Sequence, residues 1–277
     1  MKKDELHFIL DNMVYSFSNI QAFCTCPRMW ELKYVECVSG TDNIYGKFGT
    51  CCHRVLQDYL DGSLSKEDVS KRYSDEFAKC VTDVPPEYMD DDELKFFEKG
   101  MEYFSYEIEE SIVDRILKLY RKKYHRYEVK TEEYFEYTIQ EIDKKFCGYI
   151  DLLIMFYDEN DKLIDIIIAD HKTSNPPPLK KNTMRKTQYE QLMQYKRQLY
   201  LYADYISKQY ELKPDSLVLN YIRNHQLVRI EYDEEDHQET IEWIKNTIEQ
   251  IYNTDLFDMT GSYYFCKNIC DYRDDVC

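Results

Sequence analysis

The sequence lacks several features that define familiar protein classes. No apolar run is long enough to span a membrane, and the N-terminus, MKKDELHFILDNMVY, contains acids and no apolar stretch of signal-peptide length. No G-x-x-x-x-G-K-[ST] element is present, so the chain has no helicase-type phosphate loop, and there are no internal repeats. We therefore expect a cytoplasmic protein with no membrane partner, whose cysteines lie in a reducing setting.

Basic residues are scarce relative to acidic ones. The 277 residues include 36 Lys and Arg but 53 Asp and Glu, and the net charge of −17 argues against a protein that coats nucleic acid indiscriminately. A local basic groove is still compatible with this sum. Some basic side chains cluster in one region, where a phosphate-tracking groove and a solvated helix face are equally good interpretations. They are Lys180, Lys181, Arg185, Lys186, Lys196 and Arg197.

The order of the predicted elements indicates an α/β or α+β fold. The hydrophobic fraction of 43% excludes a mostly disordered chain, and the length suffices for a full core. We expect an N-terminal helical region over 1–125, then a mixed, mainly antiparallel sheet with flanking helices over 126–252, and a cysteine-bearing tail over 253–277, as one compact domain overall. The predicted helices cover about 18–24, 27–36, 51–60, 65–80, 90–124, 187–210 and 234–252, and the strands about 127–142, 147–157, 162–173, 217–223 and 227–232.

One stretch, 147–173, stands out as the centre of a candidate site. It reads CGYIDLLIMFYDENDKLIDIIIADHKT and predicts two apolar strands joined by a polar turn. Asp151 lies near the start of the first strand and Asp170 near the end of the second, and Lys172 shares a strand face with Asp170. The expected pairing places Asp151 opposite Ile168, so that both acids lie diagonally on one face. A slip of one residue would place the acids on opposite faces.

This grouping of residue types suits phosphate chemistry. Two acids can hold a hard divalent cation, Mg²⁺ or Mn²⁺, through oxygen ligands. Such a cation can make hydroxide from water and neutralise charge on a phosphate, while Lys172 orients or deprotonates that water. The plain alternative is two half-buried strands with acids at their rims. We favour the catalytic interpretation because an unpaired carboxylate in so apolar a run is costly.

Three polar residues outside the hairpin are further candidates. His53 lies in a predicted helix, where it is either an ordinary surface or core histidine or a further metal ligand beside the acids. Gln198 and Tyr202, spaced i and i+4, share a helix face. They are explained either by amphipathic packing or by polar support for Lys172 or a phosphate.

The cysteines suggest a second site. Cys266, Cys270 and Cys277 lie in the tail, and Cys24 and Cys26 lie just before Pro27. Three tail thiols and one N-terminal thiol could complete a four-thiolate site for an iron–sulfur cluster or, less favoured, zinc. The alternative is a set of reduced thiols without a ligand role.

Taken together, these residues form a known pattern. The elements SFSNIQAFCTCPRMW, GTCCH, GYID, DHKT and QLYLY occur in this order. The sequence thereby resembles the RecB-like branch of the PD-(D/E)XK nuclease superfamily, including AddB-type and CRISPR-adaptation nucleases. The resemblance implies a restriction-endonuclease-like core over 126–252.

The resemblance also implies roles for single residues. It makes His53, Asp151 and Asp170 metal ligands, and Lys172 the catalytic lysine. Gln198 and Tyr202 match the motif that follows the lysine in the family. Cys26, with Cys24 as a second candidate, matches the first ligand of a [4Fe-4S] cluster, and Cys266, Cys270 and Cys277 match the other three, although the tail spacing departs from the family.

The function implied by the resemblance is metal-dependent hydrolysis of DNA. We expect an exonuclease that works on single strands or duplex ends in recombination, repair or phage DNA processing, in a bacterial or phage-infected cell. Since the chain lacks a helicase motif, any motor or recombination partner would be a separate chain. The alternatives are a catalytically silent DNA-end-binding or scaffold protein with a cysteine-bound metal, and a nuclease directed at RNA.

Overall fold

The computed structural model describes residues 3–82, 84, 93–178 and 184–273. The chain forms two compact units. Unit 1 comprises Met1–Asn43, Tyr134–Gly148 and Glu234–Cys277, and unit 2 comprises Ile44–Glu133 and Tyr149–Asp233. Both units combine segments that are distant in sequence, so the three-part division expected from the sequence stays a prediction. None of the helices in the described ranges combines the length and apolarity needed to cross a membrane.

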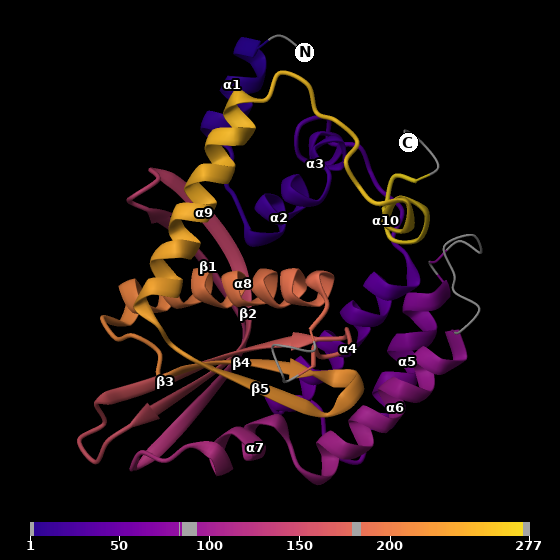
Figure 1. Ribbon diagram of the computed structural model, residues 1–277. Helices are drawn as coiled ribbons and strands as arrows, with labels where there is room; N and C mark the ends of the chain where they lie inside the picture. Colours follow the sequence, from indigo (N-terminus) through magenta and orange to yellow (C-terminus); the bar gives the residue numbers. More distant parts are fainter. Residues whose placement is uncertain (1–2, 83, 85–92, 179–183, 274–277) are drawn as a thin grey trace. The chain divides into compact units, whose positions relative to one another are not determined.

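A five-stranded sheet has its strands in sequence order (Figure 1). The strands are β1 (Arg126–Ile139), β2 (Lys144–Tyr157), β3 (Leu163–Lys172), β4 (Ser216–Tyr221) and β5 (Gln226–Glu231). The pairs β2–β3 and β4–β5 are antiparallel, whereas β3 and β4 are parallel and are joined through helix α8 (Lys186–Tyr210). A parallel pair requires such a crossover. The predicted mixed sheet with a crossing helix is therefore confirmed.

The pairing of β2 with β3 differs from the expected register. Ile168 lies opposite Leu153, not opposite Asp151, and Ala169 lies opposite Leu152. The predicted pairing was displaced by two residues. Tyr157 already pairs with Leu163, one residue beyond the expected partner, and a bulge between Phe156 and Tyr157 adds the second residue. An even displacement leaves every side chain on its predicted face.

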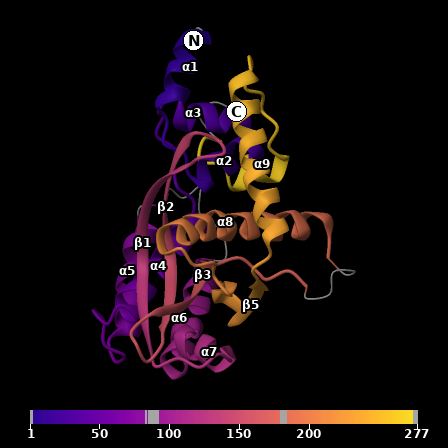
Figure 2. The same cartoon turned by 90° about the vertical axis from the view of Figure 1, so that its left-hand side faces the viewer.

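Helices cover both faces of the sheet in unit 2. Helix α7 (Ile112–Leu119) packs through its apolar side chains against alternate residues of the central strands, including Leu152, Ile154 and Ile167. Figures 1 and 2 show α8 on the opposite side of these strands. Because strand side chains alternate, Asp151, Asp170 and Lys172 project toward the α8 side.

The helical part of unit 2 consists of α4 (Ile44–Leu60), α5 (Val69–Thr82) and α6 (Glu93–Glu109), which bury a shared apolar cluster. Helix α4 begins at Ile44, earlier than the predicted start at 51. The predicted continuous helix over 90–124 is wrong, and its first residues, 90–92, lie outside the described ranges. Helix α6 ends at Glu109 because Ser111 and Asp114 form a capping box that starts α7.

The helices of unit 1 are α1 (Lys3–Asn12), α2 (Phe17–Thr25), α3 (Pro27–Tyr34), α9 (Glu234–Asn253) and α10 (Tyr263–Asn268). Pro27 starts α3 as predicted. Helix α2 begins at Phe17, one residue before the predicted start at 18, because the Ser16 hydroxyl caps it by accepting from the Asn19 amide. Helices α1 and α10 were not predicted.

Candidate metal centre and active site

The two acids and the lysine of the hairpin lie on one face of neighbouring strands of unit 2. Asp151 is 9% exposed on β2, and Asp170 is 1% exposed near the end of β3. Lys172 Nζ lies 2.5 Å from Asp170 Oδ2. Among the described residues that buried oxygen has no aligned hydrogen bond, and the Lys172 ammonium is its ion-pair partner.

His53 enters this site from α4. Its Nε2 lies 3.1 Å from the carbonyl oxygen of His171, which can only accept, so Nε2 carries a proton. Its Nδ1 faces Asp151 Oδ1 at 3.6 Å and Glu132 Oε1 at 3.8 Å. A neutral ring in this tautomer therefore presents its Nδ1 lone pair to two carboxylates. This is the arrangement of a histidine metal ligand whose other nitrogen is held by a backbone carbonyl.

Glu132 was not predicted as a site residue. Its carboxylate, His53 and Asp151 form the only such group among the described residues: three potential ligand atoms that lie within 4.8 Å of one another. Glu132 has a φ of 48°, which is uncommon for a residue inside a strand and interrupts the alternation of β1. Counting alternate positions therefore could not assign the Glu132 side chain to a face. In the sequence, the only sign that Glu132 could be a ligand was its acidic side chain, and the same strand contains several other glutamates.

The group has the chemistry of a hard divalent cation site, with one imidazole nitrogen and carboxylate oxygens. Asp170 lies outside the three-residue group and is paired with Lys172 instead. The structure thus brings together two of the three predicted metal ligands, His53 and Asp151, with Glu132. It places the third, Asp170, at the lysine.

The charged groups of the site shift one another's pKa values. Burial raises the pKa of Asp170 to about 6, opposed by Lys172 and reinforced by the charge of Asp151. Burial also opposes the charged forms of Asp151 and His53, but their mutual attraction prevails. The attraction between the two groups lowers the pKa of Asp151. Together with Glu132 it raises the pKa of His53 to about 10. A metal-free site therefore holds a proton on His53 that a cation would replace.

Helix α8 supports the lysine. Lys172 Nζ donates to Gln198 Oε1 at 2.7 Å, and Gln198 Nε2 donates to the Tyr202 hydroxyl at 2.7 Å. Burial raises the pKa of Tyr202 well above its usual value, so its hydroxyl stays protonated at neutral pH. The lysine also lies 4.4 Å from the centre of the Tyr195 ring, whose hydroxyl accepts from Gln191. Tyr195 is thus a further contact of Lys172 from α8.

A pocket of about 680 Å³ opens beside the three-residue group. Its wall includes His53 and Glu132. It is completed by Gly49, Thr50, Arg54, Gln57 and Tyr149. Its volume is that of a typical ligand site. Two of the three residues, His53 and Glu132, therefore line an open pocket.

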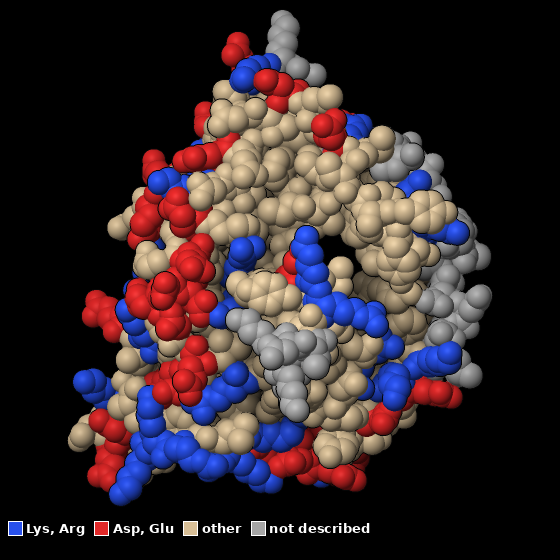
Figure 3. Space-filling model, viewed as in Figure 1, with Lys and Arg blue, Asp and Glu red and all other residues tan. Residues whose placement is uncertain are grey.

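The predicted basic cluster is only partly described. Lys180 and Lys181 lie outside the described ranges, and Lys186 pairs with Glu190 at 3.7 Å. Figure 3 shows Lys and Arg side chains interleaved with Asp and Glu on the face drawn there. Many basic side chains of unit 2 form ion pairs, for example Lys122 with Asp215 and Arg229 with Asp215. A continuous basic groove stays a prediction.

The candidate cluster cysteines belong to unit 1. Cys26 and Cys270 are buried, Cys266 is half-buried in α10, and Cys277 lies outside the described ranges. Cys24 is exposed, with Sγ 4.0 Å from Thr247 Oγ1. The three described thiols of the predicted set do not meet the 4.8 Å spacing that the His53 group meets. The described residues therefore do not form a thiolate cage, and the iron–sulfur site stays a prediction.

Comparisons with known proteins add the following. The family model of the PD-(D/E)XK nuclease superfamily matches residues 14–277. The chain is similar in structure to a proposed exonuclease from Eubacterium rectale, with a TM-score of 0.53 and 10% identity over 95% of this chain and 89% of that chain. It also aligns with the structure of SSO0001 at 15% identity over 98% of this chain and 90% of that chain, but the TM-score of 0.36 is too low to define a shared fold. No sequence among the curated proteins matches.

Proposed function

This chain belongs to the PD-(D/E)XK nuclease superfamily, and we propose that it is a divalent-metal-dependent deoxyribonuclease that degrades DNA from ends. The fold is the restriction-endonuclease-like arrangement expected from the sequence, a mixed five-stranded sheet with flanking helices. One observation supports the catalytic assignment above all others. His53, Glu132 and Asp151 gather ligand atoms within 4.8 Å, beside the strand that carries Asp170 and Lys172.

The residues have distinct roles in this proposal. His53, Asp151 and Glu132 would hold the cation, and Asp170 is buried beside Lys172 on the neighbouring strand. A bound Mg²⁺ or Mn²⁺ supplies positive charge to the scissile phosphate and lowers the pKa of a water molecule. Lys172 orients that water or neutralises charge developing on the phosphate, and Gln198 keeps the ammonium directed into the site. The pocket beside His53 admits the phosphodiester backbone.

DNA and the exonuclease mode follow from the family resemblance and from the Eubacterium rectale neighbour described as a proposed exonuclease. The partner in this proposal is a DNA end or single strand, with any helicase or recombination protein on a separate chain. The test uses three end-labelled linear substrates and one closed circle, each with Mg²⁺, Mn²⁺ or EDTA. The linear substrates are single-stranded DNA, duplex DNA and RNA, and the circle is DNA. We expect cleavage of linear DNA that requires the metal, and resistance of the closed circle.

Two variants in the same hairpin make the test specific. Asp170→Ala removes the buried acid beside Lys172, and we expect cleavage to fall at least 100-fold. Glu159→Ala removes an exposed acid in the turn and should cleave like the wild type. An Asp170→Ala protein that cleaves at the wild-type rate would refute the proposal. DNA binding without cleavage under any divalent ion would favour the alternative of a silent end-binding protein, and cleavage of RNA alone would favour the ribonuclease.

A further inference from the structure

His171 occupies a special position between Asp170 and Lys172. Its backbone N–H donates to Asp151 Oδ2 at 2.7 Å, and its carbonyl oxygen accepts from His53 Nε2 at 3.1 Å. One peptide segment of β3 therefore holds two of the proposed metal ligands. The first bond leaves Asp151 Oδ1 to face His53 Nδ1. A small rotation of this segment would displace both ligands together.

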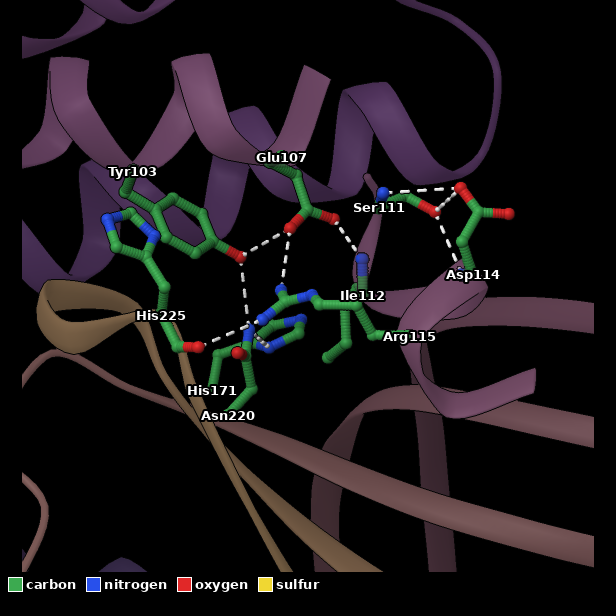
Figure 4. Close-up of polar contacts among 9 residues, drawn as sticks. All are labelled: Tyr103, Glu107, Ser111, Ile112, Asp114, Arg115, His171, Asn220 and His225. Carbon is green, nitrogen blue, oxygen red and sulfur yellow. Dashed lines mark hydrogen bonds and ion pairs between the residues drawn. The ribbon is translucent and has the colours of Figure 1, made fainter. Parts of the chain in front are cut away.

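The side chain of His171 points to the opposite face of the sheet from its two neighbours. There it meets Asn220, its direct neighbour across the parallel β3–β4 pair. Asn220 Nδ2 lies 3.1 Å from His171 Nδ1 and 3.0 Å from the Tyr103 hydroxyl of α6 (Figure 4). The side chains of Asn220, Tyr103 and His171 are all buried.

The hydrogen bonds of this network have one consistent direction. The Asn220 amide has two N–H groups and can donate one to His171 Nδ1 and the other to Tyr103. The Tyr103 hydroxyl is then free to donate its single proton to Glu107 Oε2 at 3.1 Å. The reversed amide would require Tyr103 to donate to two acceptors with one proton. The assigned orientation is therefore the one that satisfies Tyr103.

Glu107 anchors the far end of the network. Glu107 is fully buried, and its Oε1 accepts from the Ile112 backbone N–H at 2.6 Å, while its Oε2 accepts from Arg115 at 3.0 Å. Arg115 also donates to the carbonyl oxygen of His225 (Figure 4). The network thus ends on backbone groups at the α6–α7 junction and on the segment after β4. Both end points are backbone groups, the N–H of Ile112 and the carbonyl of His225, and not mobile side chains.

We infer that Asn220 is a positioning residue of the metal site, supported by Tyr103 and Glu107. This inference rests on the proposed function. Asn220 bonds to the His171 ring, whose centroid lies 5.6 Å from that of the His53 ring. The His171 backbone in turn bonds to Asp151 and to His53. The side chains of Asn220, Tyr103 and Glu107 lie outside the group of His53, Glu132 and Asp151, so the expected effect is on ligand geometry. Partners that orient metal ligands in this way typically change metal affinity by about 10- to 100-fold when removed.

A buried network could instead serve only to pack α6 against the sheet. The chain offers a matched pair of variants that separates these roles. Tyr103→Phe and Tyr73→Phe each remove one hydroxyl from a fully buried tyrosine in unit 2. The Tyr73 hydroxyl bonds only to the carbonyl oxygens of Phe96 and Phe97 in the described ranges, with no connection to His171. A purely structural role predicts equal effects of the two changes.

The experiment measures Mn²⁺ binding by calorimetry for the full chain and for Asn220→Ala, Tyr103→Phe and Tyr73→Phe, without DNA. We expect the dissociation constant for Mn²⁺ to rise about tenfold in Asn220→Ala and about threefold in Tyr103→Phe, and to stay unchanged in Tyr73→Phe. Hydrogen exchange of the amides of 168–173 should accelerate in the first two variants only. This second readout needs neither metal nor activity.

The outcomes distinguish this inference from the proposed function. If the wild type cleaves DNA and binds Mn²⁺ but Asn220→Ala binds Mn²⁺ equally well, the positioning role of Asn220 is wrong. The proposed nuclease function is then unaffected. Equal changes in Tyr103→Phe and Tyr73→Phe would also overturn it. A wild type that neither binds Mn²⁺ nor cleaves any nucleic acid would refute the proposed function and the inference with it. If Asn220→Ala does not fold, Tyr103→Phe and the exchange measurement decide.

Discussion

Replacing Glu132 by glutamine removes one negative charge from the three-residue group without changing the size of the side chain. The carboxylate lies 3.8 Å from His53 Nδ1 and belongs to the group that gathers ligand atoms within 4.8 Å. Glutamine keeps one oxygen that can still face the cation. The substitution therefore tests the contribution of the charge.

The expected size of the effect follows from Coulomb's law and exposure. Two unit charges about 4 Å apart interact by about 4 kcal/mol at an effective dielectric constant of about 20. The Glu132 side chain is 24% exposed, so water screens part of this energy. We expect a loss of about 1.5–3 kcal/mol in Mn²⁺ binding free energy, which corresponds to about 10- to 100-fold weaker binding.

The neighbouring glutamate provides the control. Glu133 lies outside the three-residue group and pairs with Lys130 at 3.7 Å. Calorimetric titration with Mn²⁺ should show weaker binding for Glu132→Gln and unchanged binding for Glu133→Gln. Wild-type affinity in Glu132→Gln, or an equal loss in both variants, would show that Glu132 is not a ligand.

Four further predictions concern the lysine, its support, stability and the thiols. Lys172→Met should lower kcat by about 10²- to 10⁴-fold with little change in Mn²⁺ affinity, and a parallel loss of affinity in calorimetry would argue against its role. Tyr195→Leu should lower kcat about tenfold by removing the ring under Lys172, whereas Tyr195→Phe should keep most of the rate in the same assay. Burial opposes ionisation of Glu76, but Arg54 and Arg72 lower its pKa, so its ionised form stabilises the fold above pH 4.5. In urea unfolding at pH 7, the free energy of unfolding of the wild type should exceed that of Glu76→Gln by about 2 kcal/mol. This difference should be lost as the pH falls below 4.5, and a difference that stays constant with pH would contradict the prediction. Brown colour and about four irons per chain after anaerobic purification would support the thiolate cluster, and iron-free protein would exclude it.

Local patterns were sufficient for most of the elements. The predicted helix over 187–210 is α8 (Lys186–Tyr210), and the helix over 234–252 is α9 (Glu234–Asn253). These predictions succeeded because helical periodicity and end signals lie within neighbouring residues. The helix predicted over 90–124 failed although its interruption was also local. The capping box of Ser111 and Asp114 was outweighed by the apolar periodicity on either side.

The face of Asp151 and Asp170 could also be deduced from sequence. Alternation along each strand has a period of two, so the two-residue register error, one residue at the turn and one at the Phe156–Tyr157 bulge, left both acids on the predicted side. The position of His53 beside Asp151 could not be deduced from sequence spacing, and only the family resemblance suggested it. The 97 positions between His53 and Asp151 contain several helices whose packing no local pattern specifies.

The sequence alone thus determined the alternating faces, the crossover between parallel strands and the acid–acid–lysine set, because each depends on residues close together along the chain. The tertiary structure alone decided which groups meet across elements. It placed Glu132 beside His53 through a positive φ in β1, and it paired Asp170 with Lys172. It also joined Asn220 to His171 across the sheet. Such contacts depend on backbone deviations and on packing between distant segments, and neither follows from the periodicity of one segment.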